Sequence, residues 1–494
     1  MDWNKLQNGS DIRGVALEGI EGESVNLTTE VTTALAQAFV AWLGEKNGKT
    51  AQIIAVGSDS RLSSPTLRQA FADGAAAAGA TVLNFGMAST PAMFMATVDE
   101  QLCADGAVMV TASHLPWNRN GLKFFTAKGG LEKADIARIL ELAPQFMGSK
   151  TKGCGEVKAV DFMATYCDIL ANYIRRGVNN GDQPLQGMHI IVDAGNGAGG
   201  FFANKVLKPL GANTTGSQFL EPDGHFPNHI PNPENKEAMA SICKAVVEHK
   251  ADLGIIFDTD VDRSAIVDRT GKSLNRNALI ALIAAVILRE HPGSTIVTDS
   301  VTSDGLAKFI ADRNGKHHRF RRGYKNVINE SLRLNANGEE SWLAIETSGH
   351  AALRENYFLD DGAYLVAKLI VEAACLRKEG KELQDLIADL QQPVESKEIR
   401  FKIDTNDFKA YGEQVLEHIK TAVEKESDWQ LVSPNYEGVR IACTGEEEQG
   451  WFLLRQSLHD PVLPLNIESN VEGGVNCITE RVLNLLSDFK ALKQ

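Results

Sequence analysis

The stretch Ala107-Val108-Met109-Val110-Thr111-Ala112-Ser113-His114 joins a short apolar run to a polar loop. The four apolar residues favour β-structure, so they predict a buried strand. Ser113 then lies just past the carboxyl end of that strand, where open α/β sheets bind their ligands. A serine that only caps the next helix would look much the same, so this loop alone leaves a structural turn and a functional site both open.

The same plan of strand, helix and second strand recurs along the chain. Apolar strands begin near Ile53, His189 and Thr295, and each is followed by a helix. Each repeat then adds a later strand that ends in a polar loop, and these loops are 111–114, 258–263 and 346–350. Such repeats imply right-handed crossovers in mixed or parallel sheets. We therefore expect an α/β fold with three related mixed-sheet domains around a central cleft, on which the three loops converge.

A smaller domain of another kind follows the repeats. Gln391-Gln392-Pro393 is typical of a linker. Beyond it the pattern predicts a helix over 407–425 and strands over 439–442 and 451–454, which indicates a smaller C-terminal α+β domain. The predicted domains are 1–160, 161–272, 273–392 and 393–494.

Composition excludes several classes of protein. The net charge of −14 among 494 residues argues against nucleic acid or an anionic membrane as a partner. The seven cysteines include no C-x-x-C pair, which is typical of free thiols in the cytosol. No signal peptide is visible, and the longest apolar run, 278–288, is too short to cross a bilayer and predicts a buried helix. We expect a soluble cytoplasmic protein.

An acidic triplet follows a second apolar strand. Residues 253–257 run directly into Asp258-Thr259-Asp260-Val261-Asp262-Arg263. Three packed carboxylates at alternate positions repel one another unless a cation lies between them. A calcium-binding EF-hand loop is excluded, because its Gly and Glu positions hold Arg263 and Arg269. The pattern predicts a site for a hard divalent cation such as Mg²⁺, with the ligands Asp258, Asp260 and Asp262.

With these loops in order, the chain resembles the α-D-phosphohexomutase family, which includes phosphomannomutase/phosphoglucomutase enzymes. The matching motifs span nearly the whole chain and keep the family's order. They are Asp11-Ile12-Arg13-Gly14, Gly57 to Pro65 (GSDSRLSSP), Thr111 to Lys123, Asp258 to Arg263, Glu346 to His350, and Asp360-Asp361-Gly362. The resemblance implies a C-terminal domain that binds phosphate.

Two motifs depart from the family pattern. The serine loop, usually T-[AG]-S-H-N-P, has Leu115 in place of the asparagine. The C-terminal phosphate loop, usually R-x-S-G-T-E-P followed by a second arginine, reads RQSLHDP over 455–461, with Pro464 at the place of that arginine. We expect this change to affect the choice of substrate more than the reaction type. Arg455 and Ser457 are kept for phosphate, and His459, Asn466 or Arg440 would take the place of the missing contact.

The resemblance also implies a reaction and a role for each motif. A phosphoryl group would move between C1 and C6 of a hexose through a bisphosphorylated sugar. Ser113, as phosphoserine, would store the phosphoryl group and give the metal a further ligand. Lys123 would act as the general acid/base, and Arg263 would stabilise charge. The remaining expected site residues are Arg13 and His114 in the catalytic pocket and Glu346, Ser348, His350 and Lys325 at the sugar.

Mannose and glucose phosphates are the leading substrates, because the loop 348–350 most resembles phosphomannomutase/phosphoglucomutase members. A hexose bisphosphate is the expected activator, and the sequence gives no oligomeric state. Phosphoglucosamine mutase and phosphopentomutase stay open within the family. Outside it, a haloacid-dehalogenase-type phosphatase would use Asp258 as its nucleophile, and a phosphosugar-binding protein would keep the fold without catalysis.

Overall fold

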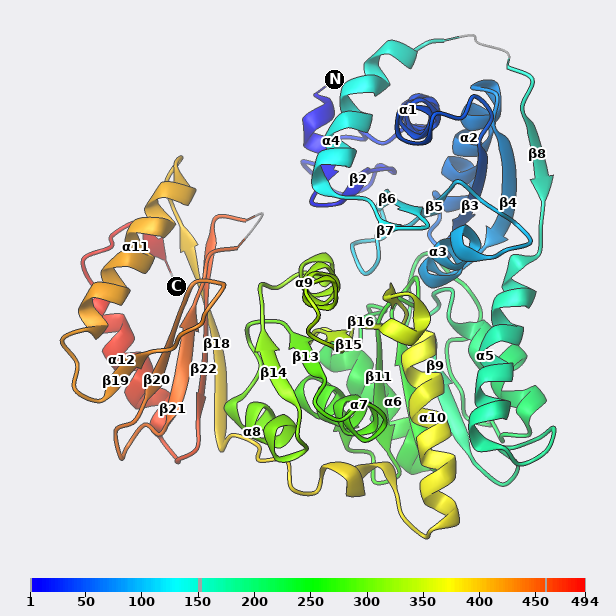
Figure 1. Ribbon diagram of the computed structural model, residues 1–494. Coiled ribbons are helices and arrows are strands. Elements are labelled where there is room, and N and C mark those ends of the chain that lie inside the picture. The colour runs from blue at the N-terminus through cyan, green and yellow to red at the C-terminus, as the bar shows by residue number, and fades with distance from the viewer. Residues whose placement is uncertain (1, 150–152, 458–459, 494) are drawn as a thin grey trace. The chain divides into compact units, whose positions relative to one another are not determined.

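The protein is described by a computed structural model that covers residues 2–149, 153–457 and 460–493 (Figure 1). The chain folds into two compact units. The first contains residues 1–283 and 348–386, and the second contains residues 284–347 and 387–494. Residues of the third predicted domain therefore occur in both units.

The first unit begins with an eight-stranded mixed sheet in the order β1-β2-β6-β5-β3-β4-β8, with β7 paired to β6. The neighbouring pairs β1–β2, β2–β6 and β6–β5 are antiparallel, and the pairs β5–β3, β3–β4 and β4–β8 are parallel. The strands are β1 (Gln7–Asn8), β2 (Asp11–Val15), β3 (Ile53–Ser58), β4 (Thr81–Met87), β5 (Gly106–Val110), β6 (Arg119–Thr126), β7 (Gly129–Gly130) and β8 (Glu156–Ala159).

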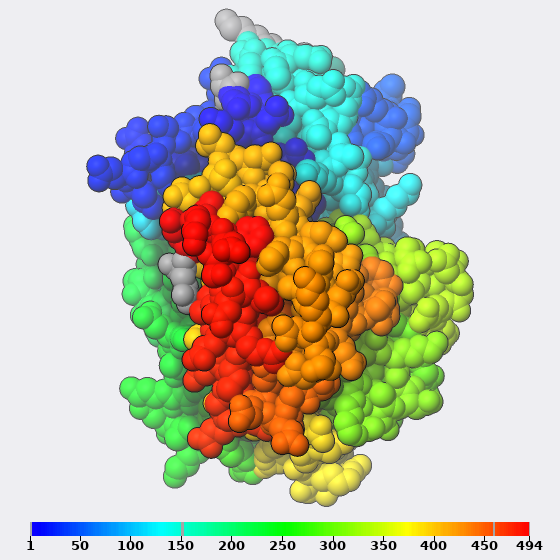
Figure 2. Space-filling model, turned by 90° about the vertical axis from the view of Figure 1, so that its left-hand side faces the viewer, coloured from blue at the N-terminus to red at the C-terminus, as the bar shows by residue number. Residues whose placement is uncertain are grey.

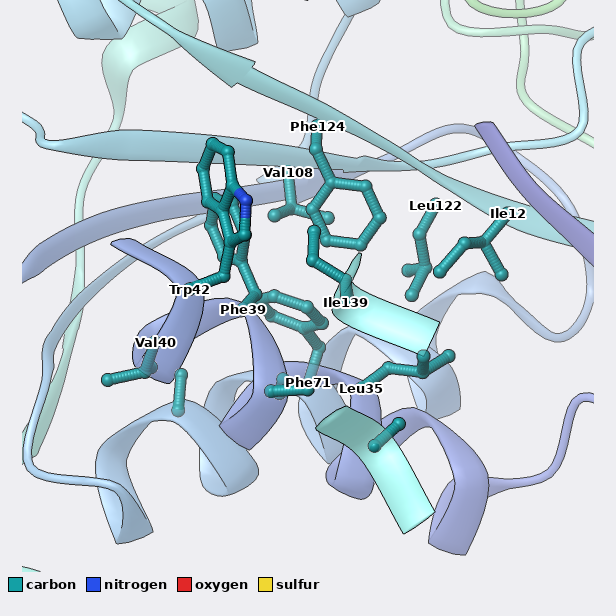
Figure 3. Packing of buried hydrophobic residues seen from close by; sticks show 14 of the residues in the cluster. Ile12, Leu35, Phe39, Val40, Trp42, Phe71, Val108, Leu122, Phe124 and Ile139 are labelled. Atoms are coloured by element: carbon teal, nitrogen blue, oxygen red, sulfur yellow. The ribbon is translucent and has the colours of Figure 1, made fainter. Parts of the chain in front are cut away.

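Aromatic packing on one face of this sheet forms the main core of the domain (Figure 3). The rings of Phe39 and Phe124 lie 4.9 Å apart, and Trp42 stacks on Phe39 at 5.9 Å. Neighbouring residues of a strand point to opposite faces, so Phe125 lies on the other face, where Phe94 stacks on it. Lys123 therefore shares the face of Phe125. The helices are α1 (Thr29–Asn47), α2 (Ser64–Ala77), α3 (Thr90–Val98) and α4 (Lys133–Leu142), with short 3₁₀ turns η1 (Trp3–Leu6) and η2 (Ala143–Phe146).

A second mixed sheet in the first unit has the order β12-β11-β10-β9, with β9 and β10 parallel and the other pairs antiparallel. Its strands are β9 (Ile190–Asp193), β10 (Leu253–Phe257), β11 (Ser264–Asp268) and β12 (Ser273–Leu274). The helix expected to end near Gly211 is a π-helical turn, η3 (Phe202–Leu207), and a 3₁₀ turn, η4 (Lys208–Leu210), before Gly211 at φ +87°. The neighbouring helices are α5 (Phe162–Val178), α6 (Lys236–His249) and α10 (Gly362–Lys378).

The third repeat contributes three parallel strands to the second unit: β13 (Thr295–Thr298), β14 (Lys316–Arg319) and β15 (Ser341–Ile345). Helices α8 (Asp304–Asp312) and α9 (Tyr324–Ala336) connect them. In the first unit, β16 (Ala351–Leu353) and β17 (Leu359–Asp360) form an antiparallel pair. The remaining elements of this repeat are α7 (Asn277–Glu290), η5 (Arg354–Asn356) and η6 (Leu383–Ile387).

The C-terminal domain, in the second unit, is an antiparallel sheet with two helices on one face (Figure 1). Its order is β19-β20-β21-β22-β18-β23. Figure 2 shows the outer side of the two helices, α11 (Phe408–Val423) in orange and α12 (Gly474–Leu485) in red. The strands are β18 (Glu395–Ile403), β19 (Trp429–Leu431), β20 (Val439–Cys443), β21 (Gly450–Leu454), β22 (Val462–Ser469) and β23 (Leu492–Lys493).

The predicted fold class is confirmed: three α/β repeats with mixed or parallel sheets precede a smaller sheet-rich domain. The apolar runs that led to this prediction are the buried strands β5 and β10. Within the described residues, every helix is too short or too polar to cross a membrane.

Candidate active site

Ser113 stands at the carboxyl end of β5 in a left-handed backbone conformation, with φ +50°. Its hydroxyl is buried and donates to Asp258 Oδ2 at 3.0 Å. Arg263 Nη2 donates to the same hydroxyl at 2.9 Å, and His114 Nδ1 lies 3.3 Å from it. The serine loop and the acidic loop that the sequence singled out therefore meet at one oxygen atom.

A buried arginine that sequence reasoning did not select holds the serine loop in place. The guanidinium of Arg61 has no exposed surface. It donates four hydrogen bonds of 2.5 to 3.0 Å to main-chain carbonyls of the loop, those of Ser113, Leu115, Pro116 and Arg119. The fork of five N–H donors makes arginine suited to this task. The sequence signal was the motif GSDSRLSSP, but main-chain acceptors cannot be read from a motif.

Asp59 connects Arg61 to the strand that carries the serine. Its Oδ2 lies 3.4 Å from Arg61 Nε and accepts a 2.7 Å hydrogen bond from the Thr111 hydroxyl. The Thr111 oxygen in turn accepts from the Ser113 main-chain N–H at 2.9 Å. Arg61, Asp59 and Thr111 thus fix both the carbonyl and the N–H of Ser113.

The turn between β10 and β11 carries three buried carboxylates. Oxygen atoms of Asp258, Asp260 and Asp262 all lie within 4.8 Å of one another. Asp260 Oδ1 and Asp262 Oδ1 are buried without a hydrogen-bond donor. Such oxygens are costly unless a cation meets them, and hard divalent ions prefer carboxylate ligands. The donor set therefore fits a divalent metal ion.

Two cations of the protein flank the carboxylates. Lys123 Nζ lies 2.9 Å from Asp260 Oδ2 and 2.5 Å from Asp262 Oδ2. Arg263 donates from Nε to Asp258 Oδ2 at 3.1 Å and from Nη1 to Asn232 Oδ1 at 3.2 Å. The N-terminus of α3 adds Thr90, whose hydroxyl donates to Asp260 at 2.5 Å.

The electrostatics of the acidic turn are uneven. Burial raises the pKa of Asp258 well above its usual value, and the charge of Asp262 raises it further. Burial acts in the same direction on Asp262, but Lys123, His350 and Arg263 lower its pKa below the usual range. Asp262 is thus held in its charged form by cations of the protein, whereas Asp258 resists ionisation.

His114 behaves as a neutral imidazole. Burial and then the charge of Arg263 lower the pKa of His114 to about 2. Its Nδ1 accepts a hydrogen bond from Arg263 Nη2 at 2.6 Å. The positive charge of Arg13 acts in the same direction, and Arg13 lies opposite Gly121 in the β2–β6 ladder with its Nη2 donating to Asp11 at 2.9 Å.

The end of the third polar loop lies beside the acidic turn in the first unit. Gly349, at φ +95°, packs so closely that an added Cβ would lie 2.7 Å from the carbonyl oxygen of Ser264. His350 Nδ1 lies 2.6 Å from Asp360 Oδ2 and 3.8 Å from Asp262 Oδ1. Although burial alone lowers it, Asp360 and Asp262 raise the pKa of His350 to about 9, so a protonated imidazole here pairs with carboxylates. Ser348, in the same loop, is buried.

The other residues expected to hold substrate belong to the second unit. Glu346 Oε1 accepts the main-chain N–H of Gly323 at 2.6 Å, at the start of α9. Lys325 lies in the first turn of that helix. Arg455 is largely buried, with Nη1 3.9 Å from Glu437 Oε1, and Ser457 Oγ accepts the main-chain N–H of Asp460 at 3.3 Å.

Two further residues, Arg440 and His459, are also predicted to bind phosphate. Arg440 is buried and donates to the carbonyl oxygens of Ser300 at 3.0 Å and Thr302 at 3.1 Å. Its guanidinium stacks on Trp451 at 3.6 Å. Arg440 therefore fastens β20 to the loop after β13, and its role toward phosphate stays a prediction. His459 lies outside the described residues.

Family models match most of the chain. Domains I, II and III of the phosphoglucomutase/phosphomannomutase family, each described as alpha/beta/alpha, match residues 4–145, 164–271 and 275–394.

Relatives and a solved structure agree with these matches. A phosphomannomutase from Escherichia coli is 31% identical, with 96% of this chain and 98% of the relative covered. A phosphomannomutase/phosphoglucomutase from Pseudomonas syringae is 29% identical over 94% of this chain and 91% of its own length. The crystal structure of a phosphoglucomutase/phosphomannomutase family protein from Burkholderia thailandensis aligns with a TM-score of 0.78 at 25% identity, covering 98% of this chain and 97% of that one. The chain therefore belongs to the phosphoglucomutase/phosphomannomutase family.

Proposed function

We propose that this protein is a phosphohexomutase that interconverts hexose 1-phosphate and hexose 6-phosphate through a phosphorylated Ser113. The carrying observation is the Ser113 hydroxyl, which lies 3.0 Å from Asp258 Oδ2 and 2.9 Å from Arg263 Nη2. It places a nucleophilic oxygen, a buried acidic cluster and a guanidinium at one point. The names of the relatives support the same activity.

Phosphoryl transfer proceeds in two mirrored steps. In the first, the bond between phosphorus and Ser113 Oγ breaks as a free hydroxyl oxygen of the sugar phosphate bonds to phosphorus, which yields a hexose bisphosphate. The hydroxyl proton passes through Lys123 Nζ and ends on Ser113 Oγ. In the second step, Ser113 Oγ bonds to the other phosphorus as the bond between that phosphorus and its sugar oxygen breaks, and the Ser113 proton passes back through Lys123 Nζ to that sugar oxygen.

Arg263 and the acidic cluster balance charge during transfer. Arg263 Nη2, already at the serine oxygen, stabilises the negative charge on the phosphoryl oxygens. Asp258, Asp260 and Asp262 would hold a Mg²⁺ ion. When bound, that ion neutralises charge on the transferring phosphoryl group.

The substrate is held by groups that do not react. Glu346 and Ser348 would bond the sugar hydroxyls, and Arg455 with Ser457 would bind the phosphate that is not transferred. His350 and Lys325 are further proposed contacts. Binding through the phosphate and the middle of the ring lets the sugar enter in either direction, which a mutase requires.

Mannose and glucose phosphates are the proposed substrates, with a hexose bisphosphate as activator. The names phosphomannomutase and phosphoglucomutase among the relatives support this choice. We also propose a cytoplasmic location, since all seven cysteines are free thiols. Assays with the 1-phosphates of mannose, glucose and glucosamine, each with a bisphosphate activator, test the choice. A glucosamine phosphate preferred by tenfold or more would contradict it.

A labelling experiment tests the reaction itself. Protein treated with labelled hexose bisphosphate should carry an acid-stable phosphate on Ser113, and Ser113→Ala should lose the label and about four orders of magnitude of turnover. A hydroxylamine-labile label on Asp258 would indicate a phosphatase of the haloacid-dehalogenase type. Binding of hexose phosphate without any turnover would indicate a phosphosugar-binding protein.

A further inference from the structure

The predicted C-terminal phosphate loop begins with Arg455, but strand β22, which follows the loop, contains no lysine or arginine. Pro464, where the family pattern has an arginine, lies in β22, and its carbonyl accepts the main-chain N–H of Arg455 at 3.1 Å. Arg440 donates its hydrogen bonds to carbonyl oxygens of the loop after β13. Asn466 donates its amide to Glu398 at 3.0 Å. Among the described residues that the sequence offered, Arg455 and Ser457 are left for a dianionic group.

Arg322 lies beside this loop, although it is far away in sequence. Its main-chain N–H donates to Glu437 Oε2 at 3.2 Å, and Glu437 Oε1 lies 3.9 Å from Arg455 Nη1. The Ser300 hydroxyl donates to the same carboxylate. Three donor groups from separate segments of the second unit thus converge on one anionic group, which marks the place as suited to negative charge.

Internal symmetry indicates why Arg322 is there. Arg322 Nε lies 3.4 Å from Asp299 Oδ2, and the Thr347 hydroxyl donates to that same oxygen at 2.7 Å. Arg61, Asp59 and Thr111 show the same pair of distances, 3.4 and 2.7 Å. Arg61 is completely buried under the serine loop, whereas the Arg322 side chain is 24% exposed. The third repeat keeps the arrangement, but its arginine is partly exposed.

The neighbouring charges are consistent with an anion site. Arg322 directly precedes Gly323, whose main-chain N–H donates at 2.6 Å to Glu346, the carboxylate that is predicted to bind the sugar. Three other acidic groups near Arg322 already accept hydrogen bonds. Asp299 accepts one from Thr347, Glu437 from Ser300, and Glu398 from Asn466. Burial, and after it the charge of Arg322, lowers the pKa of Arg455. Because the charge of Arg322 opposes that of Arg455, an anion bound between the two guanidinium groups would stabilise both.

We propose that Arg322 supplies the second guanidinium for the non-reacting phosphate of the sugar substrate, in place of the arginine that Pro464 replaces. This inference rests on the proposed function. Arg322 and Arg455 together form a two-arginine clamp, and Ser457 adds a hydroxyl. Planar guanidinium groups bind phosphate oxygens in pairs, so two of them fix both position and orientation.

The test compares Arg322→Ala, Arg322→Lys and the matched control Arg321→Ala. Arg321 is the exposed neighbour in the same loop, and its Nε donates to the Tyr436 carbonyl at 2.9 Å. Arg322→Ala should raise KM for hexose 1-phosphate by about tenfold or more, with kcat within about threefold. Arg322→Lys should fall between, because lysine keeps the charge and loses the fork. Arg321→Ala should stay within about twofold of wild type.

Binding of glucose 1-phosphate by calorimetry separates this inference from the proposed function. Measured in a Ser113→Ala background, Arg322→Ala should weaken binding by the same factor as KM. If the wild-type protein converts its substrate but Arg322→Ala binds glucose 1-phosphate as tightly as Arg321→Ala, the role of Arg322 is overturned and the proposed function stands. A wild-type protein with neither turnover nor binding overturns the proposed function. Arg322→Lys decides the question if the alanine variant does not fold.

Discussion

At the scale of single residues, the site depends on a serine held in an unfavourable backbone conformation. A left-handed φ costs a residue with a side chain roughly 1 kcal/mol. Ser113 keeps φ +50° because its N–H is bound by Thr111 and its carbonyl by Arg61. The strain points the hydroxyl at Asp258 and Arg263, so the residues behind the loop determine where the nucleophile lies.

Arg61→Lys should separate positioning from binding. Lysine reaches one or two of the four carbonyls that Arg61 binds, and each buried carbonyl left without a donor costs about 1–3 kcal/mol. A shift of the serine by even about 1 Å lowers kcat by roughly a hundredfold, whereas KM stays within about threefold. Steady-state kinetics and thermal unfolding measure both effects.

Arg138→Lys is the matched control for Arg61→Lys. Arg138 lies in the same domain and pairs at the surface with Glu45 at 2.8 Å, so its replacement should change stability by less than about 1 kcal/mol and kcat not at all. An Arg61→Lys protein with wild-type kcat would mean that Arg61 does not position the serine.

At the scale of elements, two repeats end a strand in the same way. The Thr111 hydroxyl after β5 and the Thr347 hydroxyl after β15 each donate to a strand-end aspartate at 2.7 Å, Asp59 and Asp299 respectively. In the second repeat, the equivalent Asp193 is instead bound by His229 at 3.0 Å and by Gln218 at 2.7 Å. Two of the three repeats thus share one device for fixing a functional loop.

The same substitution in the two strands should therefore have different kinetic effects. Thr111→Val leaves Asp59 with one donor fewer and releases the Ser113 N–H, so kcat should fall about tenfold, equivalent to roughly 1.4 kcal/mol. Thr347→Val loosens the loop 346–350, so KM for the sugar phosphate should rise by a similar factor. Equal effects of both variants on kcat would contradict this division of roles.

The sequence predicted the elements well where apolar runs are long and end in polar loops, as in β5 and β10. It also selected Ser113, Asp258 and Lys123, which the structure brings together. It did not select Arg61 or Arg322, because their partners are main-chain carbonyls or residues distant in sequence. The contacts of Arg440 could not be predicted for a related reason, since stacking on Trp451 and binding of carbonyls leave no pattern in the sequence.

At the scale of the whole molecule, an acidic chain is expected to bind an anionic substrate. The net charge is −14, which favours the approach of a divalent cation and opposes that of a phosphate. Local cations near the reacting oxygen, such as Arg263 and Lys123, counter this field. Binding of the metal should therefore precede tight binding of substrate.

Metal binding should also stabilise the protein in a pH-dependent way. Without metal, the folded-state pKa of Asp258 is raised above its unfolded value of about 4, so stability conferred by its protonated form is lost as the pH rises through the folded pKa. Asp262, with a lowered pKa, has the opposite sign and loses its contribution only as the pH falls below the usual carboxyl range. The metal-free protein should thus unfold at a lower temperature at about pH 8 than at about pH 5.

Mg²⁺ at about a hundred times its Kd should add roughly 2.7 kcal/mol to the free energy of unfolding and reverse this loss. Calorimetry with EDTA or Mg²⁺ at both pH values measures the effect, and Asp258→Asn should reduce the pH dependence and remove most of the Mg²⁺ response. A pH trend of undiminished size in Asp258→Asn would assign it to other groups, such as His350, whose pKa is raised to about 9.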